Sequence, residues 1–240
     1  METNNFNYVQ SEQETGSMSR TFVANVFSWM FAALAITTIV AYYFGNNLQL
    51  LSLLVNMEVG GLTGLGYVVM FAPLGFVLAM SLGFNKFSYP VILFLFLLYS
   101  AVMGASLSFI FLMYTSGSIF GTFAAAAGMF GIMAVVGYTT NTDLTKFGSI
   151  MMMGLLGIIV ASIINWFLQS DSMSYIISFI GVLVFTGLTA YDVQKLKRIG
   201  AGVEFGNETT SKLVILGALN LYLDFINLFL FLLRLFGNRK

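Results

Sequence analysis

Two residue types are missing from this 240-residue chain. It has no cysteine, which excludes disulfides, thiol catalysis and cysteine metal sites. It has no histidine either, which excludes Ser–His catalytic pairs, most zinc sites and the side chain that ordinarily titrates near neutral pH. Any response to pH in the physiological range therefore has to come from carboxyl groups in unusual surroundings.

Charge is also scarce. Ten Lys and Arg balance ten Asp and Glu, so the net charge is zero and no basic surface favours nucleic acid. Charged residues make up 8% of the chain and hydrophobic residues 58%, and the mean hydropathy is +0.90. A soluble domain of this size needs a polar surface that so few charges cannot supply. We therefore predict an all-α polytopic membrane protein that is embedded in the lipid bilayer and needs no cofactor.

Seven apolar windows are long enough to cross a membrane, which takes roughly 17–25 residues per helix. They are residues 22–44, 66–84, 90–114, 119–138, 148–168, 175–191 and 213–236. These windows predict one domain of seven transmembrane helices over residues 22–236. Residues 1–21 form a polar tail on the cytoplasmic side, whose first 19 residues we expect to be disordered, and residues 237–240 form a short C-terminal tail.

The basic residues predict the orientation, because cytoplasmic links carry an excess of Lys and Arg. The cations that fall before the first window or in alternate links are Arg20, Lys86, Lys146, Lys195, Lys197, Arg198 and Lys212. With seven spans, these residues and the N-terminus lie in the cytoplasm. Arg234, Arg239 and Lys240 are the exception, because they reach the far side if the last helix crosses fully. A re-entrant last helix is the alternative, and we expect the full crossing.

Small residues four apart predict where helices approach one another closely in lipid. The pairs are Ala124 and Gly128, Ala127 and Gly131, and Gly157 and Ala161. We expect these positions to lie at helix–helix contacts.

Two aspartates stand in the last two apolar segments. Asp192 directly follows the window 175–191, and Asp224 lies within the window 213–236. A carboxylate at membrane depth costs about 2.5–3.5 kcal/mol on insertion scales, so such residues usually face the bundle interior and mark a pathway. We expect the two aspartates to share one site.

The aspartates belong to polar stripes with helical spacing. The stripes are Asn220, Asp224 and Asn227 on the last predicted helix, and Thr186, Thr189 and Asp192, beside Tyr191, on the helix before it. Two such stripes most simply face each other inside the bundle. The Asn and Thr residues have an alternative role, which is to form hydrogen bonds between helices. The two Asp residues are less suited to that role, because a neutral side chain would form such bonds without carrying a charge.

If the carboxyl groups meet, they cannot both ionise cheaply in a low dielectric, so we expect them to share a proton. Loss of that proton, or arrival of a cation, would separate or bridge them. Carboxylate, amide and carbonyl oxygens are also the ligands that calcium prefers, so Asp192 and Asp224 could hold calcium transiently. The depths of the two residues in the membrane differ, which is a difficulty for this contact. Asp192 lies near the cytoplasmic end of its predicted helix, whereas Asp224 lies more than ten residues from the start of the last predicted helix. Either the last helix begins beyond the membrane surface, or the helix before it ends below the surface.

Two segments carry a resemblance to a known family. The segment TGLTAYDVQKLK at residues 186–197 and the segment ILGALNLYLDFINLFL at residues 215–230 resemble the Bax inhibitor family, in its bacterial branch. The resemblance implies seven helices with the seventh central, and a pH-sensitive calcium leak in a bacterial inner membrane, with Asp192 and Asp224 as the sensor. Some family members place an arginine in the second helix that pairs with the first aspartate, and residues 66–84 contain no basic residue.

Three functions remain open on the sequence. The first, which we favour, is a cation leak gated by the aspartate pair, with no enzymatic activity. The second is a non-conducting interaction protein that modulates a membrane protease or a stress response. The third is an intramembrane aspartyl protease, since those enzymes also carry Tyr-Asp and a second Asp on adjacent helices. They require Gly-x-Gly-Asp at the second site, where this chain has Leu221-Tyr222-Leu223-Asp224.

Overall fold

The computed structural model describes residues 2–56, 61–204 and 206–240, with side chains from Gly16 onward. The long helices are α1 (Glu2–Gly45), α3 (Gly64–Leu82), α4 (Tyr89–Leu107), α6 (Ser116–Thr139), α7 (Thr145–Leu168), α8 (Asp171–Ala201) and α9 (Glu208–Phe236). The short elements are α2 (Leu48–Leu54), β1 (Val55–Asn56), β2 (Gly61–Leu62) and α5 (Ile110–Met113). Strands β1 and β2 pair antiparallel, with Val55 opposite Leu62. The predicted all-α class is confirmed.

Seven helices in the described part of the chain are long and apolar enough to cross a membrane, as the seven windows predicted. Helices α8 and α9 both extend well beyond their windows at the same end of the bundle. Helix α8 continues to Ala201, and α9 already begins at Glu208. Helix α1 has its bounds at Glu2 and Gly45. The prediction that residues 1–19 are disordered falls mostly on residues whose side chains lie outside the described part of the chain.

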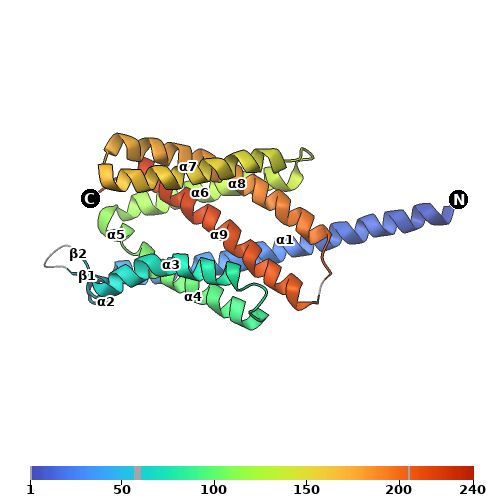
Figure 1. Cartoon of the computed structure of the whole chain (residues 1–240), viewed down its shortest axis with the longest axis horizontal. Helices are drawn as coiled ribbons and strands as arrows, with labels where there is room; N and C mark the ends of the chain where they lie inside the picture. Colours follow the sequence, from blue (N-terminus) through green and yellow to red (C-terminus); the bar gives the residue numbers. More distant parts are fainter. Residues whose placement is uncertain (1, 57–60, 205) are drawn as a thin grey trace.

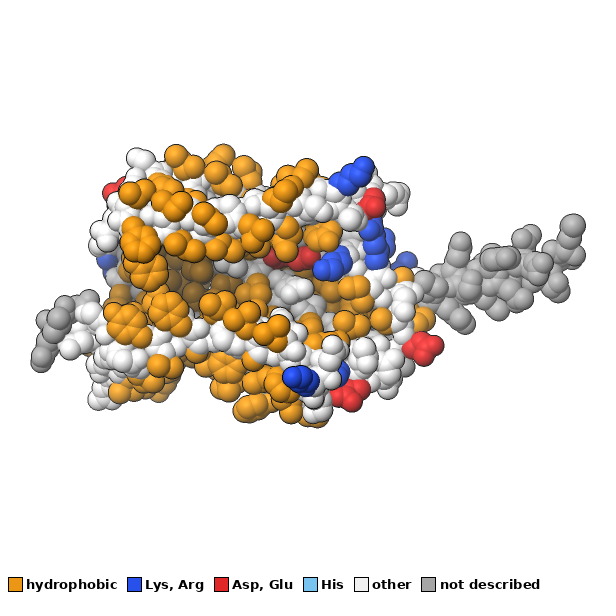
Figure 2. Space-filling view, viewed as in Figure 1, with side chains coloured by type: hydrophobic (Ala, Val, Ile, Leu, Met, Phe, Trp, Pro, Cys, Tyr) orange, Lys and Arg blue, Asp and Glu red, His pale blue; other side chains and the backbone are white. Residues whose placement is uncertain are grey.

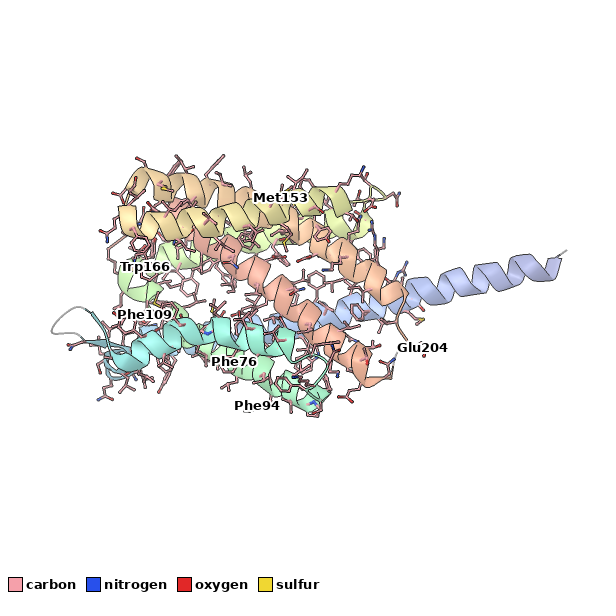
Figure 3. All side chains as sticks on the ribbon, viewed as in Figure 1. Phe76, Phe94, Phe109, Met153, Trp166 and Glu204 are labelled. Carbon is pink, nitrogen blue, oxygen red and sulfur yellow. The ribbon has the colours of Figure 1, made fainter. Side chains whose placement is uncertain are left out.

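Helix α9 is the centre of the bundle. It crosses the molecule obliquely between a layer of α6, α7 and α8 and a layer of α1, α3 and α4 (Figure 1), and it contacts α1, α4, α6 and α8. In α9, 67% of the most apolar 18-residue window is buried, against 50% in α8 and 11% in α3 and α7. Met153 and Trp166 on α7, labelled in Figure 3, are both 63% exposed. Helices α3 and α7 therefore present most of their surface outward, and α9 least.

The C-terminal tail shows that α9 runs the full length of the bundle. The backbone N–H of Thr115 donates to the carbonyl of Asn238 at 3.1 Å, and that of Lys240 donates to the carbonyl of Met113 at 3.0 Å. These contacts hold the tail against α5 and the start of α6, at the end opposite the N-terminus (Figure 1). The re-entrant alternative for the last helix does not describe this fold.

The small-residue pairs predicted the wrong helix contacts. A Cβ atom added at Gly128, Gly131 or Gly157 would meet nothing within 4 Å, so these positions face away from the bundle. The close approach of α6 to α8 occurs instead at Gly137, where an added Cβ would collide with the backbone carbonyl of Ala190. Spacing alone does not reveal which side of a helix faces inward.

At the end of the bundle where α8 ends, basic side chains tie neighbouring turns to α8 and α9. Lys197 Nζ donates to the carbonyl of Tyr138 at 2.8 Å, at the end of α6. Lys212 Nζ donates to the carbonyl of Phe87 at 3.2 Å, in the turn between α3 and α4. Most of the basic side chains visible in Figure 2 gather at this end of the molecule. They therefore stabilise the ends of neighbouring helices, whose carbonyls lack partners within the helix.

The turn between α6 and α7 is held most firmly. Arg198 forms an ion pair with Asp143 at 2.7 Å, and Gln194 donates to the carbonyl of Thr142 at 2.8 Å. Hydrogen bonds from Thr145, and then the one from Arg198, lower the pKa of the exposed Asp143 carboxyl below its usual range. Asp143 is therefore ionised throughout the physiological pH range.

Candidate functional site

Asp192 on α8 and Asp224 on α9 meet inside the bundle. Their carboxyl groups lie within hydrogen-bonding range of each other. Asp224 is only 5% exposed, and its Oδ2 atom receives no hydrogen bond from any described residue. Two ionised carboxylates in such surroundings would repel each other, so the contact requires a shared proton or a bridging cation.

The long extensions of α8 and α9 make this contact possible. Asp192 lies nine residues before the end of α8 at Ala201, and Asp224 lies sixteen residues after the start of α9 at Glu208. At 1.5 Å per residue these separations are about 14 and 24 Å along the helix axes. Because α9 is oblique to the bundle and begins beyond the expected window, the two residues reach the same depth. The difference in membrane depth that the apolar windows predicted for Asp192 and Asp224 therefore does not prevent their contact.

The aspartate pair opens into a cavity of about 450 Å³ between α7, α8 and α9. Its lining residues are Met152, Leu155, Ile159, Phe185, Leu188, Tyr191, Asp192, Lys195, Asn220, Leu223, Asp224 and Asn227. Figure 2 shows acidic atoms beside basic ones in the hollow on this face, between the α7–α8 layer and the α3 layer. The cavity therefore combines apolar walls with a few convergent polar groups, which is typical of a ligand or ion site.

The predicted polar stripe of α9 faces this cavity, and that of α8 does so only in part. Tyr191, Asn220 and Asn227 line the cavity together with both aspartates. Thr186 and Thr189 do not, because their hydroxyls donate to the carbonyls of Val182 and Phe185 on their own helix, at 2.6 and 2.8 Å. A threonine in a helix commonly satisfies its hydroxyl in this way.

Lys195 is the functional candidate that the sequence reasoning missed. It lies three residues after Asp192 on α8, lines the same cavity, and its ammonium group attracts the Asp192 carboxylate. The three-residue spacing, which places both side chains on one face of a helix, was the available signal. Although residues 66–84 provide no cation, α8 itself provides one beside the first aspartate.

Aromatic side chains lie at the side of the cavity toward the C-terminal end of α9. The rings of Phe185 and Phe231 lie 5.8 Å apart, one turn beyond Asn227. Phe231 is also the side chain that a Cβ atom at Gly181 would meet. Lys195 therefore lies on the side of the cavity toward the cation-rich end, and aromatic side chains lie on the opposite side.

The oxygen ligands that line the cavity suit only a weakly bound cation. The described residues contain no cluster of three Asp, Glu, His or Cys side chains that could hold a metal ion. A divalent cation in the cavity would meet the two carboxylates, with the amide groups of Asn220 and Asn227 on the same wall. Calcium usually takes six to eight oxygen ligands, so water would have to complete the shell. Such a site would favour passage of the ion over tight binding.

Comparisons with known proteins give the chain a family. Residues 19–240 match the family model described as "Inhibitor of apoptosis-promoting Bax1". The inner membrane protein YbhL of Escherichia coli K12 is 46% identical over 222 residues, which cover 92% of this chain and 93% of that protein. A Borreliella burgdorferi protein is 43% identical over 91% of this chain and 92% of its own length. A Deinococcus radiodurans protein is 39% identical over 96% of this chain and 95% of its own.

Proposed function

This chain belongs to the Bax inhibitor family of multi-pass integral membrane proteins, and on that premise we propose that it is a calcium-permeable leak channel. The Asp192–Asp224 pair is its pH-sensitive gate. The observation that carries the proposal is the buried contact between the two carboxyl groups at the wall of a cavity of about 450 Å³. A pair of amides would join α8 and α9 equally well without the cost of burying acidic groups.

The gate works through the charge of the pair. While the carboxyl groups share a proton they attract each other, and α8 and α9 stay together. Without that proton, two like charges in a low dielectric repel, which favours separation of the helices, or they bind a cation between them. Lys195, three residues after Asp192 on α8 and in the lining of the same cavity, places a positive charge beside the pair. Ionisation of the pair therefore opens the path, and protonation closes it.

The charge distribution favours one orientation in the membrane. The cation-rich end, where α8 ends and α9 begins, faces the cytoplasm, and so does the N-terminus. In a bacterial inner membrane, the cavity is then reached from the cytoplasm. The Phe185–Phe231 ring contact lies on the other side.

Flux through the pure protein tests the proposal. Full-length protein is reconstituted into liposomes that enclose a calcium dye, and calcium entry is followed between pH 5.5 and 8.5. We expect flux well above that of empty liposomes, with a sigmoidal dependence on pH. If the reconstituted protein is correctly folded and no flux is seen at any pH, the channel proposal is wrong. The non-conducting interaction protein is then the better description.

A further inference from the structure

A second apolar space lies on the other side of α9, between α1 and α6. It consists of two cavities of about 410 and 160 Å³, which share Thr38 and Phe123 in their walls. Phe31 and Ile39 on α1 and Phe120 on α6 are 61%, 67% and 56% exposed, so the space opens toward the bilayer. We call these two adjacent cavities the α1–α6 crevice.

The crevice is long, narrow and closed at one end. Its α1 wall runs from Phe31 to Tyr42, which is about 16 Å along a helix. One turn before Phe31, the rings of Phe27 and Phe130 meet at 6.4 Å and close the space between α1 and α6. The other end reaches Phe111, beside the start of α6. An apolar slot of this length fits most of one acyl chain.

Two cations lie where the crevice reaches the end of the bundle. Lys240 Nζ donates to the carbonyl of Phe111 at 2.9 Å, and Phe111 itself lines the crevice. Arg239 pairs through its backbone with Tyr114, next to Lys240. Neither side chain forms an ion pair with another described residue. The Lys240 ammonium has further N–H donors, and the Arg239 guanidinium is exposed.

We propose that the α1–α6 crevice binds one acyl chain of an anionic phospholipid, whose phosphate pairs with Arg239 and Lys240. Charge complementarity selects this occupant. Two cations are held at the open end of an apolar slot, at the level where lipid headgroups lie. The same contact explains why basic residues are tolerated at the end of the bundle opposite the cation-rich one. Anionic headgroups attract each such cation by roughly 1 kcal/mol, or about fivefold in binding.

Tryptophan quenching by brominated lipids tests the proposal, since the chain contains only two tryptophans, Trp29 and Trp166. The reporter is Phe120→Trp, in a background with Trp29→Phe and Trp166→Phe. Vesicles contain a few per cent of brominated phosphatidylglycerol or of brominated phosphatidylcholine in the unlabelled neutral lipid. We expect the anionic lipid to quench this reporter with an apparent affinity roughly five- to twentyfold higher than the neutral one. The matched control is a second variant with Trp29→Phe alone, in which Trp166, 63% exposed on α7, is the sole tryptophan and should show no preference.

One double substitution should remove the preference, and a separate substitution should weaken the binding of both lipids. Arg239→Gln with Lys240→Gln removes both charges, whereas Arg234→Gln removes a cation from the same end and should leave the preference intact. Ala127→Phe fills the crevice without altering any charge and should lower quenching by both lipids. Calcium flux and thermal unfolding of each variant show whether the protein is still folded.

Three results would overturn the proposal. One is equal quenching of the Phe120→Trp reporter by the two lipids. Another is a preference that survives the double glutamine change, because the charges would then play no part. The third is a shift of the protein from dimer to monomer on crevice filling, which would mean that a second copy of the chain occupies the crevice. Inorganic phosphate should not compete at millimolar concentration, because the acyl chain provides the main contact.

Discussion

Asp224 combines burial with an oxygen atom that receives no hydrogen bond from the described residues, and it interacts with a second carboxyl group, that of Asp192. We predict that Asp192→Asn and Asp224→Asn each flatten the pH dependence of calcium flux, because an amide has nearly the shape of the carboxyl group but does not ionise near neutral pH. Liposome flux between pH 5.5 and 8.5 measures this. Thermal unfolding should remain within a few degrees of the unchanged protein.

The matched control for these variants is Asp143→Asn. Hydrogen bonds from Thr145 and Arg198 lower the pKa of Asp143, so the stabilisation they provide is complete above the ordinary aspartate range. It is lost only as the pH falls through the lower value in the folded protein. Between pH 5.5 and 8.5 the carboxylate does not change charge, so this variant should keep the slope of the flux profile. If Asp143→Asn flattened the profile as the two buried substitutions do, the sensor would be the turn between α6 and α7.

Lys195 competes with an incoming cation for the Asp192 carboxylate. We predict that Lys195→Gln lowers the calcium concentration for half-maximal flux by roughly two- to tenfold, since a charge beside the site no longer repels the ion. Lys146→Gln removes a cation from the same end of the bundle, away from the cavity lining, and should have little effect. Equal effects of the two changes would mean that Lys195 acts through the general surface potential.

At the level of helices, the contact of α6 with α8 depends on one glycine. We predict that Gly137→Ala destabilises the protein by about 1–3 kcal/mol or more, because the added methyl group collides with the backbone at Ala190, which cannot move aside like a side chain. Gly128→Ala on the same helix meets no atom within 4 Å and should be neutral or stabilising by up to about 1 kcal/mol. Thermal unfolding in detergent compares the two, and equal stability would contradict this assignment of the contact.

The helices themselves were predictable, and their faces and ends were less so. Apolar windows located all seven spans because crossing a bilayer demands a long apolar run. The windows ended too early at Tyr191 and began too late at Leu213, because helices can continue past the hydrocarbon layer, where charged residues cost nothing. Glycine spacing failed at Gly128 because small residues also occur on faces that point toward lipid.

For the whole molecule, the arrangement of charges and of the cavity predicts a response that depends on the side of the membrane. Protons from the cation-rich end should reach the aspartate pair more readily, because Lys195 and the polar lining lie toward that end. The apolar Phe185–Phe231 ring contact lies toward the other end. Flux in oriented vesicles, with pH set independently on the two sides, measures this. Control by pH at the C-terminal end alone would contradict both the orientation and the site.

The site was predictable only where its residues were unusual for their surroundings. Asp192 and Asp224 stood out against an apolar background, and the cost of burying acidic groups indicated a shared location. Lys195 was treated as a topology marker because it follows an apolar run, although its spacing from Asp192 places it beside the site. Thr189 appeared to extend the polar stripe, yet it bonds to its own helix. The sequence does not show whether a hydroxyl is satisfied locally.

The central position of α9 has a consequence for biogenesis. It is the last of the seven spans to leave the ribosome, yet it contacts α1, α4, α6 and α8 and is the most buried of them. Until it enters the membrane, the earlier helices pack against one another without the helix that contacts four of them. The newly made chain therefore lacks its central helix until then, and insertases or proteases can act on it in that interval. Translation of the final segment would then be the event that commits the protein to its fold.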